Sequence, residues 1–202
     1  MLFRSEALRS GLADGSIDLA LGYFPDLDGD AFLHQRFYTH TFAAMARRGH
    51  PLSLKALAGQ PLSVDDYLQA GHAAVSSPAR SNGLLESTLE RLSMRRRVVL
   101  RTPHHLGLPG ILEQTDLLAT LPLAAGARLA QLGALQLLRL PFEPPSFAVQ
   151  QHWHRRAQDD PRHRWLRQQM AVLFTEASDE WREIEAALYG AGYRQRQARR
   201  TA

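Results

Sequence analysis

The chain has 202 residues, of which 45% are hydrophobic and 22% are charged, and its formal net charge is +4 at pH 7. This is the composition of an ordinary globular protein, and the absence of cysteine excludes disulfides, thiolate nucleophiles and cysteine-based zinc or iron–sulfur sites. No apolar run approaches the roughly 18 residues that span a bilayer, and the N-terminal residues lack the order of a signal peptide. We therefore expect a cytoplasmic protein with no membrane partner.

The excess of positive charge is not concentrated on one segment. Lys55 is the only lysine, and the arginines are dispersed except at residues 95–97, 155–167 and 193–200. Binding of nucleic acid through its phosphates needs clustered cations, so this dispersion argues against a nucleic-acid-binding surface. The last basic stretch is polar and has no apolar periodicity, and we expect residues 179–202 to be the end of a helix followed by a disordered tail.

Helix-like and strand-like patterns alternate in the first part of the chain. The apolar run at residues 17–21 is interrupted only by Asp18, as is typical of a buried strand, and Asp14 with Gly15 forms a turn signal before it. In chain order, we expect a helix over residues 3–13, strands over 17–21, 32–37 and 41–46, helices over 54–58 and 64–70, and a strand over 72–76.

The second part of the chain continues the alternation. Pro161 stands at the first position of the last expected helix, with Asp159 or Asp160 as its cap. Helical spacing predicts a solvated face for the arginines of this helix, among them Arg164 and Arg167. The expected elements are a helix after residue 83, a strand over 98–101, a helix over 106–113, a strand over 117–121, a helix over 123–132, strands over 135–140 and 147–153, and a helix from residue 161.

This order of elements predicts an α/β fold with two lobes. If the chain crosses between the lobes near residues 72–76 and returns near residues 147–154, its middle segment forms one lobe and its two ends form the other. We expect lobe I to contain residues 1–72 and 150–178, and lobe II to contain residues 73–149. Two lobes of this kind leave a cleft at the strand ends, where open α/β sheets bind small ligands.

Four segments carry a resemblance to one family, the LysR-type transcriptional regulators. The segment GLADGSIDLALGYFPD at residues 11–26 is similar to the part of these regulators that leads into the effector cleft, and GHPL at residues 49–52 stands where their HPL signature falls. TPHHLGLPGILEQTDLLATLP at residues 102–122 and WHRRAQDDPRHRWLR at residues 153–167 resemble the branch that senses aromatic compounds, which includes nodulation regulators. The resemblance extends over residues 8–174.

The resemblance implies two Rossmann-like lobes joined by two crossover strands, the type 2 periplasmic-binding-protein-like architecture, and a sensor rather than an enzyme. It implies that a small aromatic inducer, with an anionic one as an open option, binds between the lobes and controls transcription. Members of the family begin with a winged helix-turn-helix and a linker helix, which this sequence does not show, and we expect the first strand and helix of the sensing domain to be missing as well. DNA binding is expected only through such an N-terminal domain, and the implied assembly is a homo-oligomer.

Hydroxyl and amide side chains precede the helix expected after residue 83. Ser76, Ser77, Ser81 and Asn82 stand there, where hydroxyl groups and backbone N–H groups can hold a carboxylate or nitro group. The alternative is that Ser81 or Asn82 caps the helix. The resemblance places Asn82 against the ligand, so we expect these four residues to bind the effector.

Residues at other strand and helix ends complete the expected effector site. Tyr23 and Phe24 follow a buried strand directly, so their rings could stack on an aromatic effector, with ordinary packing as the alternative. His104 opens a helix and can donate or accept a hydrogen bond, and Thr120 ends a strand. The alternatives for these two residues are a structural histidine and a cap of the next helix.

His152 and His154 share one face of an expected strand, and Trp153 lies on the other face, because side chains alternate along a strand. A His-x-His pair on a strand has metal-ligand spacing, which leaves a metal-dependent hydrolase as an alternative, but no third ligand motif accompanies it. Since the strand is a crossover in the resembling family, we expect Trp153 and His154 to belong to the effector site. No metal or cofactor is expected, and a solute-binding protein of the same fold is the remaining alternative.

Overall fold

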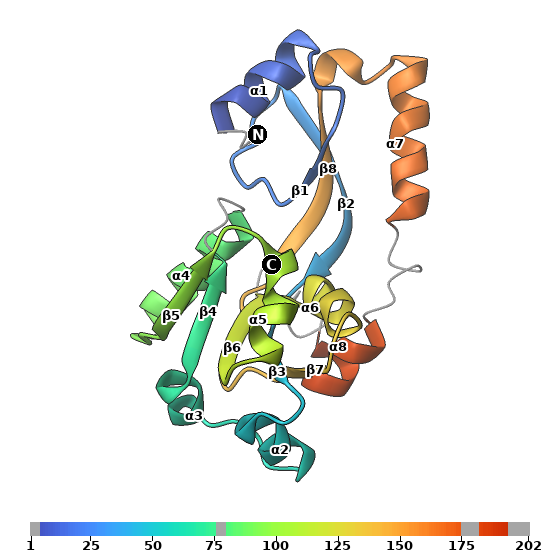
Figure 1. Ribbon diagram of the computed structural model, residues 1–202. Helices are drawn as coiled ribbons and strands as arrows, with labels where there is room; N and C mark the ends of the chain where they lie inside the picture. Colours follow the sequence, from blue (N-terminus) through green and yellow to red (C-terminus); the bar gives the residue numbers. More distant parts are fainter. Residues whose placement is uncertain (1–4, 76–79, 175–181, 194–202) are drawn as a thin grey trace. The chain divides into compact units, whose positions relative to one another are not determined.

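A computed structural model describes residues 5–75, 80–174 and 182–193 of the chain (Figure 1). The architecture is mixed α/β with two separate sheets, as the sequence predicts. The contacts divide the chain into two compact units: unit 1 combines Met1–Thr39 with Phe147–Asp179, and unit 2 combines His40–Ser146 with Glu180–Ala202. None of the helices in the described ranges has both the length and the apolarity that crossing a membrane requires.

Unit 1 is built on a three-stranded sheet in the order β1-β8-β2. The central strand β8 (Phe147–His154) pairs antiparallel with the short strand β1 (Ala20–Gly22), and β2 (Phe32–His40) forms the other edge. β1 is shorter than the strand expected over residues 17–21. The N–H of Ile17 still bonds to the carbonyl of Gly11 at the end of the preceding helix (2.9 Å), so the extended strand begins later.

The sheet of unit 1 has one helix on each face (Figure 1). α1 (Ser5–Asp14) packs its buried leucines against the face that carries Ala20. α7 (Pro161–Leu173) lies on the opposite face, where the side-chain amide of Gln151 donates a hydrogen bond to the carbonyl of Arg167 (3.2 Å). Because side chains alternate along a strand, neighbouring residues of β8 point to opposite faces of the sheet, one towards α1 and the next towards α7. The apolar cluster on the α1 face contains Leu8, Leu12, Ala20 and Leu27.

Unit 2 contains a five-stranded sheet in the order β5-β4-β6-β3-β7. β4 runs parallel to β5 and β6, whereas β3 runs antiparallel to β6 and β7. Its strands are β3 (Phe42–Arg47), β4 (Gly71–Val75), β5 (Arg97–Thr102), β6 (Leu117–Pro122) and β7 (Leu135–Leu138). Its described helices are α2 (Pro51–Leu57), α3 (Val64–Gln69), α4 (Arg80–Arg91), α5 (Leu108–Glu113), α6 (Leu123–Ala130) and α8 (Arg182–Tyr189).

The two faces of the unit 2 sheet have different cores. On the face covered by α5 and α6 the core is apolar, and burial of each leucine there contributes roughly 1.5–3 kcal/mol. The intervening residues of β6 point the other way, so that Thr120 meets Tyr67 of α3 on the opposite face. Polar groups are therefore gathered on that second face. The apolar cluster contains Met45, Ala73, Leu108, Leu112, Ala119, Leu121, Leu129 and Leu135.

The sequence predicts the end of a helix and a disordered tail over residues 179–202, and the described residues in this range contain a separate helix. Among the described ones, Arg182–Tyr189 forms α8, and both Tyr189 and Tyr193 are buried in unit 2. The hydroxyl of Tyr189 donates to the carbonyl of Phe42 (2.7 Å), and its ring stacks on that of Tyr193 with centroids 4.8 Å apart. Two tyrosines four residues apart thus pack this segment against unit 2. The polar and basic residues around them conceal this packing in the sequence pattern.

The two units also differ from the expected lobes over residues 40–72. The sequence assigns these residues to lobe I, whereas β3 pairs with both β6 and β7. That pairing places the segment after β2 in unit 2, together with α2 and α3. The division therefore falls at the end of β2 and not at the start of β4.

Candidate functional site

Unit 1 contains a cavity of about 300 Å³ beside β8, which we call the aromatic cavity. The connection between β1 and β2 supplies most of its wall, and β2 and β8 supply the rest. Four of its lining side chains carry aromatic rings, two from phenylalanine and two from histidine. The lining residues are Phe24, Pro25, Leu27, Asp28, Gly29, Phe32, His34, Gln150 and His152.

His152 lies in the wall of the aromatic cavity and is only 2% exposed. The ring of Phe24 meets it edge-on with centroids 5.7 Å apart, and the ring of His34 lies at the same centroid distance, tilted by 40°. Burial lowers the pKa of His152 to about 4, and the nearby His34 acts in the same direction. At pH 7 the side chain is therefore a neutral imidazole with one N–H donor and one acceptor nitrogen.

Neither ring nitrogen of His152 has a hydrogen-bond partner among the described residues. A buried donor or acceptor without a partner costs on the order of 1–3 kcal/mol of stability. Such a group in the wall of a cavity marks a place where a molecule able to donate and accept a hydrogen bond would be stabilised. From the sequence, His152 is considered only as a metal ligand on a crossover strand, because the ring that packs on it comes from another segment.

The two aromatic residues that follow β1 have different surroundings. Phe24 lines the aromatic cavity, and its ring lies close to Gly22, whose φ is +145°. A Cβ added at Gly22 would lie 3.1 Å from Cε2 of Phe24, so glycine leaves room for the ring. Tyr23 packs instead on Phe147, with ring centroids 5.5 Å apart. The predicted contact of these residues with an effector remains a prediction.

Trp153 faces away from the aromatic cavity and has its own polar partners. It is buried, and its Nε1–H donates to Oε1 of Gln158 (2.8 Å). The guanidinium of Arg167 lies 4.6 Å from the indole centroid and donates to the carbonyls of Ala157 (3.0 Å) and Gln158 (2.8 Å). The solvated face predicted for Arg167 is therefore wrong, because the indole and two carbonyl groups hold this side chain inside unit 1.

His154 ends β8 and caps the short turn that follows. Its Nδ1 accepts a hydrogen bond from the N–H of Arg156 (3.2 Å), and its ring meets that of Phe32 edge-on with centroids 5.5 Å apart. Within the described ranges, no group of three or more histidine, aspartate or glutamate side chains could hold a metal ion. The metal-hydrolase alternative therefore has no support in this part of the chain.

Thr120 belongs to a buried polar group in unit 2. Its hydroxyl shares a hydrogen bond of 2.7 Å with the hydroxyl of Tyr67, whose side chain is fully buried. His72 is also fully buried, and its Nε2 lies 2.7 Å from the carbonyl oxygen of Tyr67. Burial lowers the pKa of His72 to about 4. Thr120 does not cap the next helix, because Pro122 takes the N-cap position of α6.

The remaining predicted site residues belong to two segments of unit 2. His104 is exposed before a 3₁₀ turn at His105–Gly107, and its side chain makes no capping bond. Ser76 and Ser77 lie outside the described residues. Ser81 and Asn82 lie in the first turn of α4, which begins before residue 83, and their side chains also lie outside the description.

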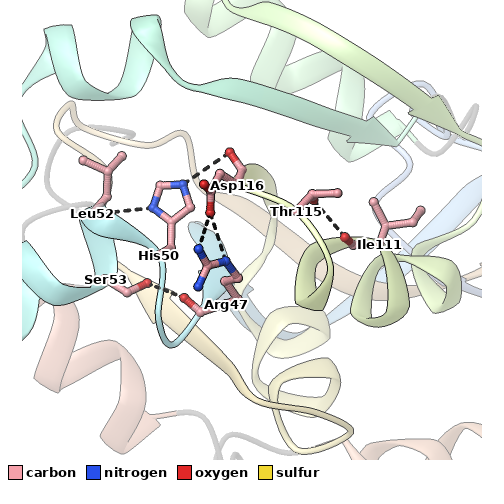
Figure 2. Close-up of polar contacts among 7 residues, drawn as sticks. All are labelled: Arg47, His50, Leu52, Ser53, Ile111, Thr115 and Asp116. Carbon is pink, nitrogen blue, oxygen red and sulfur yellow. Dashed lines mark hydrogen bonds and ion pairs between the residues drawn. The ribbon is translucent and has the colours of Figure 1, made fainter.

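Figure 2 shows how the GHPL segment is held in unit 2. Nδ1 of His50 accepts from the N–H of Leu52 (3.0 Å) and so caps α2, while its Nε2 lies 3.3 Å from the carbonyl oxygen of Asp116. Arg47 donates to the carboxylate of Asp116 from both Nε (2.9 Å) and Nη2 (2.5 Å). Burial lowers the pKa of His50, which favours the neutral ring that both contacts need. This cluster joins the start of α2 to the start of β6 and has a structural role.

Comparison with known proteins relates these features to one family. A family model described as the LysR substrate binding domain matches residues 2–174. The chain is 32% identical over 170 residues to the HTH-type transcriptional activator NagR of a Ralstonia species, and 30% identical over 172 residues to the HTH-type transcriptional activator NahR of Pseudomonas putida. These matches cover 84% and 85% of this chain but 54% and 55% of the relatives. The chain thus spans about half the length of these relatives.

A solved structure has a similar fold. It is the regulatory domain of MexT, a transcriptional activator in Pseudomonas aeruginosa, with a TM-score of 0.66 and 28% sequence identity. The match covers 82% of this chain and 77% of that domain. These similar proteins are regulators of transcription and not enzymes.

Proposed function

Because the chain belongs to the family of LysR substrate-binding domains, we propose that it senses an effector for a transcriptional regulator and that this effector is a small aromatic molecule. The regulatory part of the proposal rests on the family and on the relatives, which are transcriptional activators. The aromatic part rests on the segments at residues 102–122 and 153–167, which resemble the aromatic-sensing branch, and on the composition of the aromatic cavity.

The aromatic cavity is the observation that carries this proposal. Phe24 and Phe32 line it together with the imidazoles of His34 and His152. Aromatic rings attract one another in offset or edge-to-face arrangements by roughly 0.5–1.5 kcal/mol beyond the effect of burial. Walls of this kind favour a planar aromatic ligand over an aliphatic ligand of the same size.

We also propose that the residues expected from the sequence contact the effector. Phe24 has the strongest support, because it lines the aromatic cavity. Trp153, His154 and Thr120 already have hydrogen-bond partners, so any contact they make with an effector would add to a structural role. The proposed effector-binding residues are Tyr23, Phe24, Ser76, Ser77, Ser81, Asn82, His104, Thr120, Trp153 and His154.

The proposed function implies partners besides the effector. A sensing domain controls transcription when it is joined to a DNA-binding part, so we propose that DNA is bound through an N-terminal winged helix-turn-helix. We propose a homo-oligomer as the assembly and the cytoplasm, where transcription takes place, as the location. The effector would act by shifting the population of conformations, which requires that it bind one of them more tightly.

A thermal-shift panel on the folded chain tests the proposal. The panel contains aromatic carboxylates, flavonoids and nitroaromatics. Cyclohexanecarboxylate is the matched control for benzoate, because it keeps the ring size and the charge but has no aromatic ring. A ligand that binds only the native state at 100 times its Kd stabilises that state by about 2.7 kcal/mol. For a chain of this size, each kcal/mol raises the Tm by roughly 2–4 °C.

We expect at least one aromatic compound to raise the Tm in a saturable way, and cyclohexanecarboxylate to leave it unchanged. If every aromatic compound leaves the Tm of a cooperatively unfolding sample unchanged, the aromatic effector is wrong. Equal stabilisation by benzoate and cyclohexanecarboxylate would also contradict it, because the effect would then come from the charge.

A further inference from the structure

We propose that the aromatic cavity binds a phenol with a single ring and that the hydroxyl group of this ligand hydrogen-bonds to His152. The inference rests on the proposed function for the aromatic class of the ligand. It adds the place of binding, the number of rings and the chemical group that is recognised. The cavity, its lining rings and the unpaired imidazole all belong to unit 1.

The volume of the cavity suits a ligand with one substituted ring. At about 300 Å³, it lies at the lower end of the roughly 300–1,000 Å³ that sites for small molecules occupy. A benzene ring with one or two short substituents fits such a volume. The rings of Phe24 and Phe32 provide aromatic contacts for a single planar ligand.

The imidazole of His152 determines which polar group the ligand should carry. A neutral imidazole offers one donor and one acceptor, and both nitrogens here lack partners among the described residues. A phenolic hydroxyl can donate to the acceptor nitrogen of the ring, which is a strong acceptor. An ether oxygen or a carboxylate only accepts, so neither can pair with that nitrogen.

The charges around the cavity disfavour an anionic ligand. Asp28 is among the lining residues, and no lysine or arginine is. Arg9 lies beside this lining: its Nη2 is 2.7 Å from Oδ1 of Asp28, and its guanidinium is 5.1 Å from the ring of Phe32. The charges of Arg9 and Asp28 offset each other. A carboxylate in the cavity would therefore find no unpaired cation among the lining residues.

The ring nitrogens of His152 are buried, and the ring of Phe24 meets the imidazole edge-on with centroids 5.7 Å apart. We therefore expect Phe24 to move when a ligand reaches these nitrogens. Phe24 belongs to the connection between β1 and β2, so we expect its side chain to rotate aside without a change in strand pairing.

Three para-substituted compounds test the proposal by titration of the folded chain, with Kd measured by NMR or calorimetry. They are 4-methylphenol, its methyl ether 4-methylanisole and 4-methylbenzoate, which share one ring and differ in the polar group. We expect 4-methylphenol to bind at least about fivefold more tightly than the ether, because its O–H donates to the imidazole nitrogen whereas the oxygen of an aryl ether is a weak acceptor. We expect 4-methylbenzoate to bind more weakly than the phenol.

Variants of His152 connect this preference to the imidazole. His152→Phe keeps an aromatic ring but removes both nitrogens, and we expect the ratio of the two Kd values to fall to about one. His152→Gln keeps a donor and an acceptor, and we expect it to retain a preference for the phenol. The matched control is His163→Phe, which changes a histidine of α7 outside the cavity and should keep the wild-type ratio.

The proposal is wrong if the wild-type chain binds the phenol and the ether within about twofold, or if His152→Phe keeps the wild-type preference. In both cases aromatic binding itself would stand, so the proposed function would survive. Absence of binding by every aromatic compound would overturn both. If His152→Phe does not fold, the resonance of the acceptor ring nitrogen of His152 in the wild-type chain decides, since 4-methylphenol can donate to this nitrogen and must shift its resonance as a hydrogen bond does, whereas 4-methylanisole has no donor and must not.

Discussion

Two buried histidines, His72 in β4 and His152 in β8, have neutral imidazoles in different surroundings. His72 pairs one nitrogen with the carbonyl of Tyr67, and its ring packs on that of Tyr67 with centroids 4.6 Å apart. Neither nitrogen of His152 is paired among the described residues, and this side chain lines a cavity. The first arrangement is typical of a structural histidine, and the second of a group that binds a ligand.

The burial of His72 predicts a loss of stability in mild acid. Its pKa is about 4 in the folded chain and about 6.5 in the unfolded chain. Between these values the unfolded chain binds a proton that the folded chain does not, so the free energy of unfolding falls as the pH falls from 6.5 to 4. From pH 7 to pH 5 this one group accounts for a loss of about 2 kcal/mol.

The variant His72→Gln tests this effect, because its amide can still donate to the carbonyl of Tyr67 but does not titrate. Urea denaturation at pH 7 and pH 5 gives the free energy of unfolding of both proteins. The loss between the two pH values should be smaller in the variant by about 2 kcal/mol. Equal losses in the variant and the wild-type chain would show that His72 is not the group responsible.

For single residues, the sequence predicts which face of a strand a side chain takes but not which side chains it contacts. The alternation of His152 and Trp153 across β8 follows from strand geometry, and the strand itself is confirmed. The partners of these side chains do not follow from it. The ring over His152 comes from a connection, and the guanidinium over Trp153 comes from a helix, so both depend on how separate segments pack.

At the scale of elements, α8 is the part of unit 2 that the sequence prediction does not place there. The hydroxyl of Tyr189 links α8 to β3, because it donates a hydrogen bond to the carbonyl of Phe42. The same hydroxyl accepts from the N–H of Leu140 (3.4 Å). The elements expected between residues 41 and 138 are all present with the predicted type, because their apolar periods are regular. α8 has apolar residues of its own, but its contact with unit 2 depends on the ring and hydroxyl of Tyr189, which meet residues far away in the sequence.

Substitution of Tyr189 measures how much α8 contributes to unit 2. Tyr189→Ala removes a buried ring and its hydrogen bonds, and we expect the free energy of unfolding to fall by about 3–5 kcal/mol. Tyr189→Phe leaves the carbonyl of Phe42 without this donor and should cost roughly 1–3 kcal/mol. Glu183→Ala, an exposed position of the same helix, is the control and should change the value by less than about 0.5 kcal/mol. Urea denaturation checks all three, and an unchanged Tyr189→Ala variant would mean that α8 does not stabilise unit 2.

At the scale of the whole molecule, the fold class and the family could be predicted from the sequence. The type 2 periplasmic-binding-protein-like fold is confirmed by the likeness to the MexT regulatory domain, and the LysR family by the match over residues 2–174. The alternation of strands and helices and the quoted motifs are local features, so one sequence is enough to detect them. The division into units was harder to predict, because it depends on β3 pairing with strands that lie far along the chain.

The binding of an aromatic effector is the central claim, and calorimetric titration of the folded chain tests it most directly. The ligand is the aromatic compound that gives the largest thermal shift, titrated at two temperatures. We predict saturable binding with one site per chain and a negative heat-capacity change, because apolar surface is buried on binding. The absence of any saturable signal with aromatic compounds at both temperatures would contradict the claim.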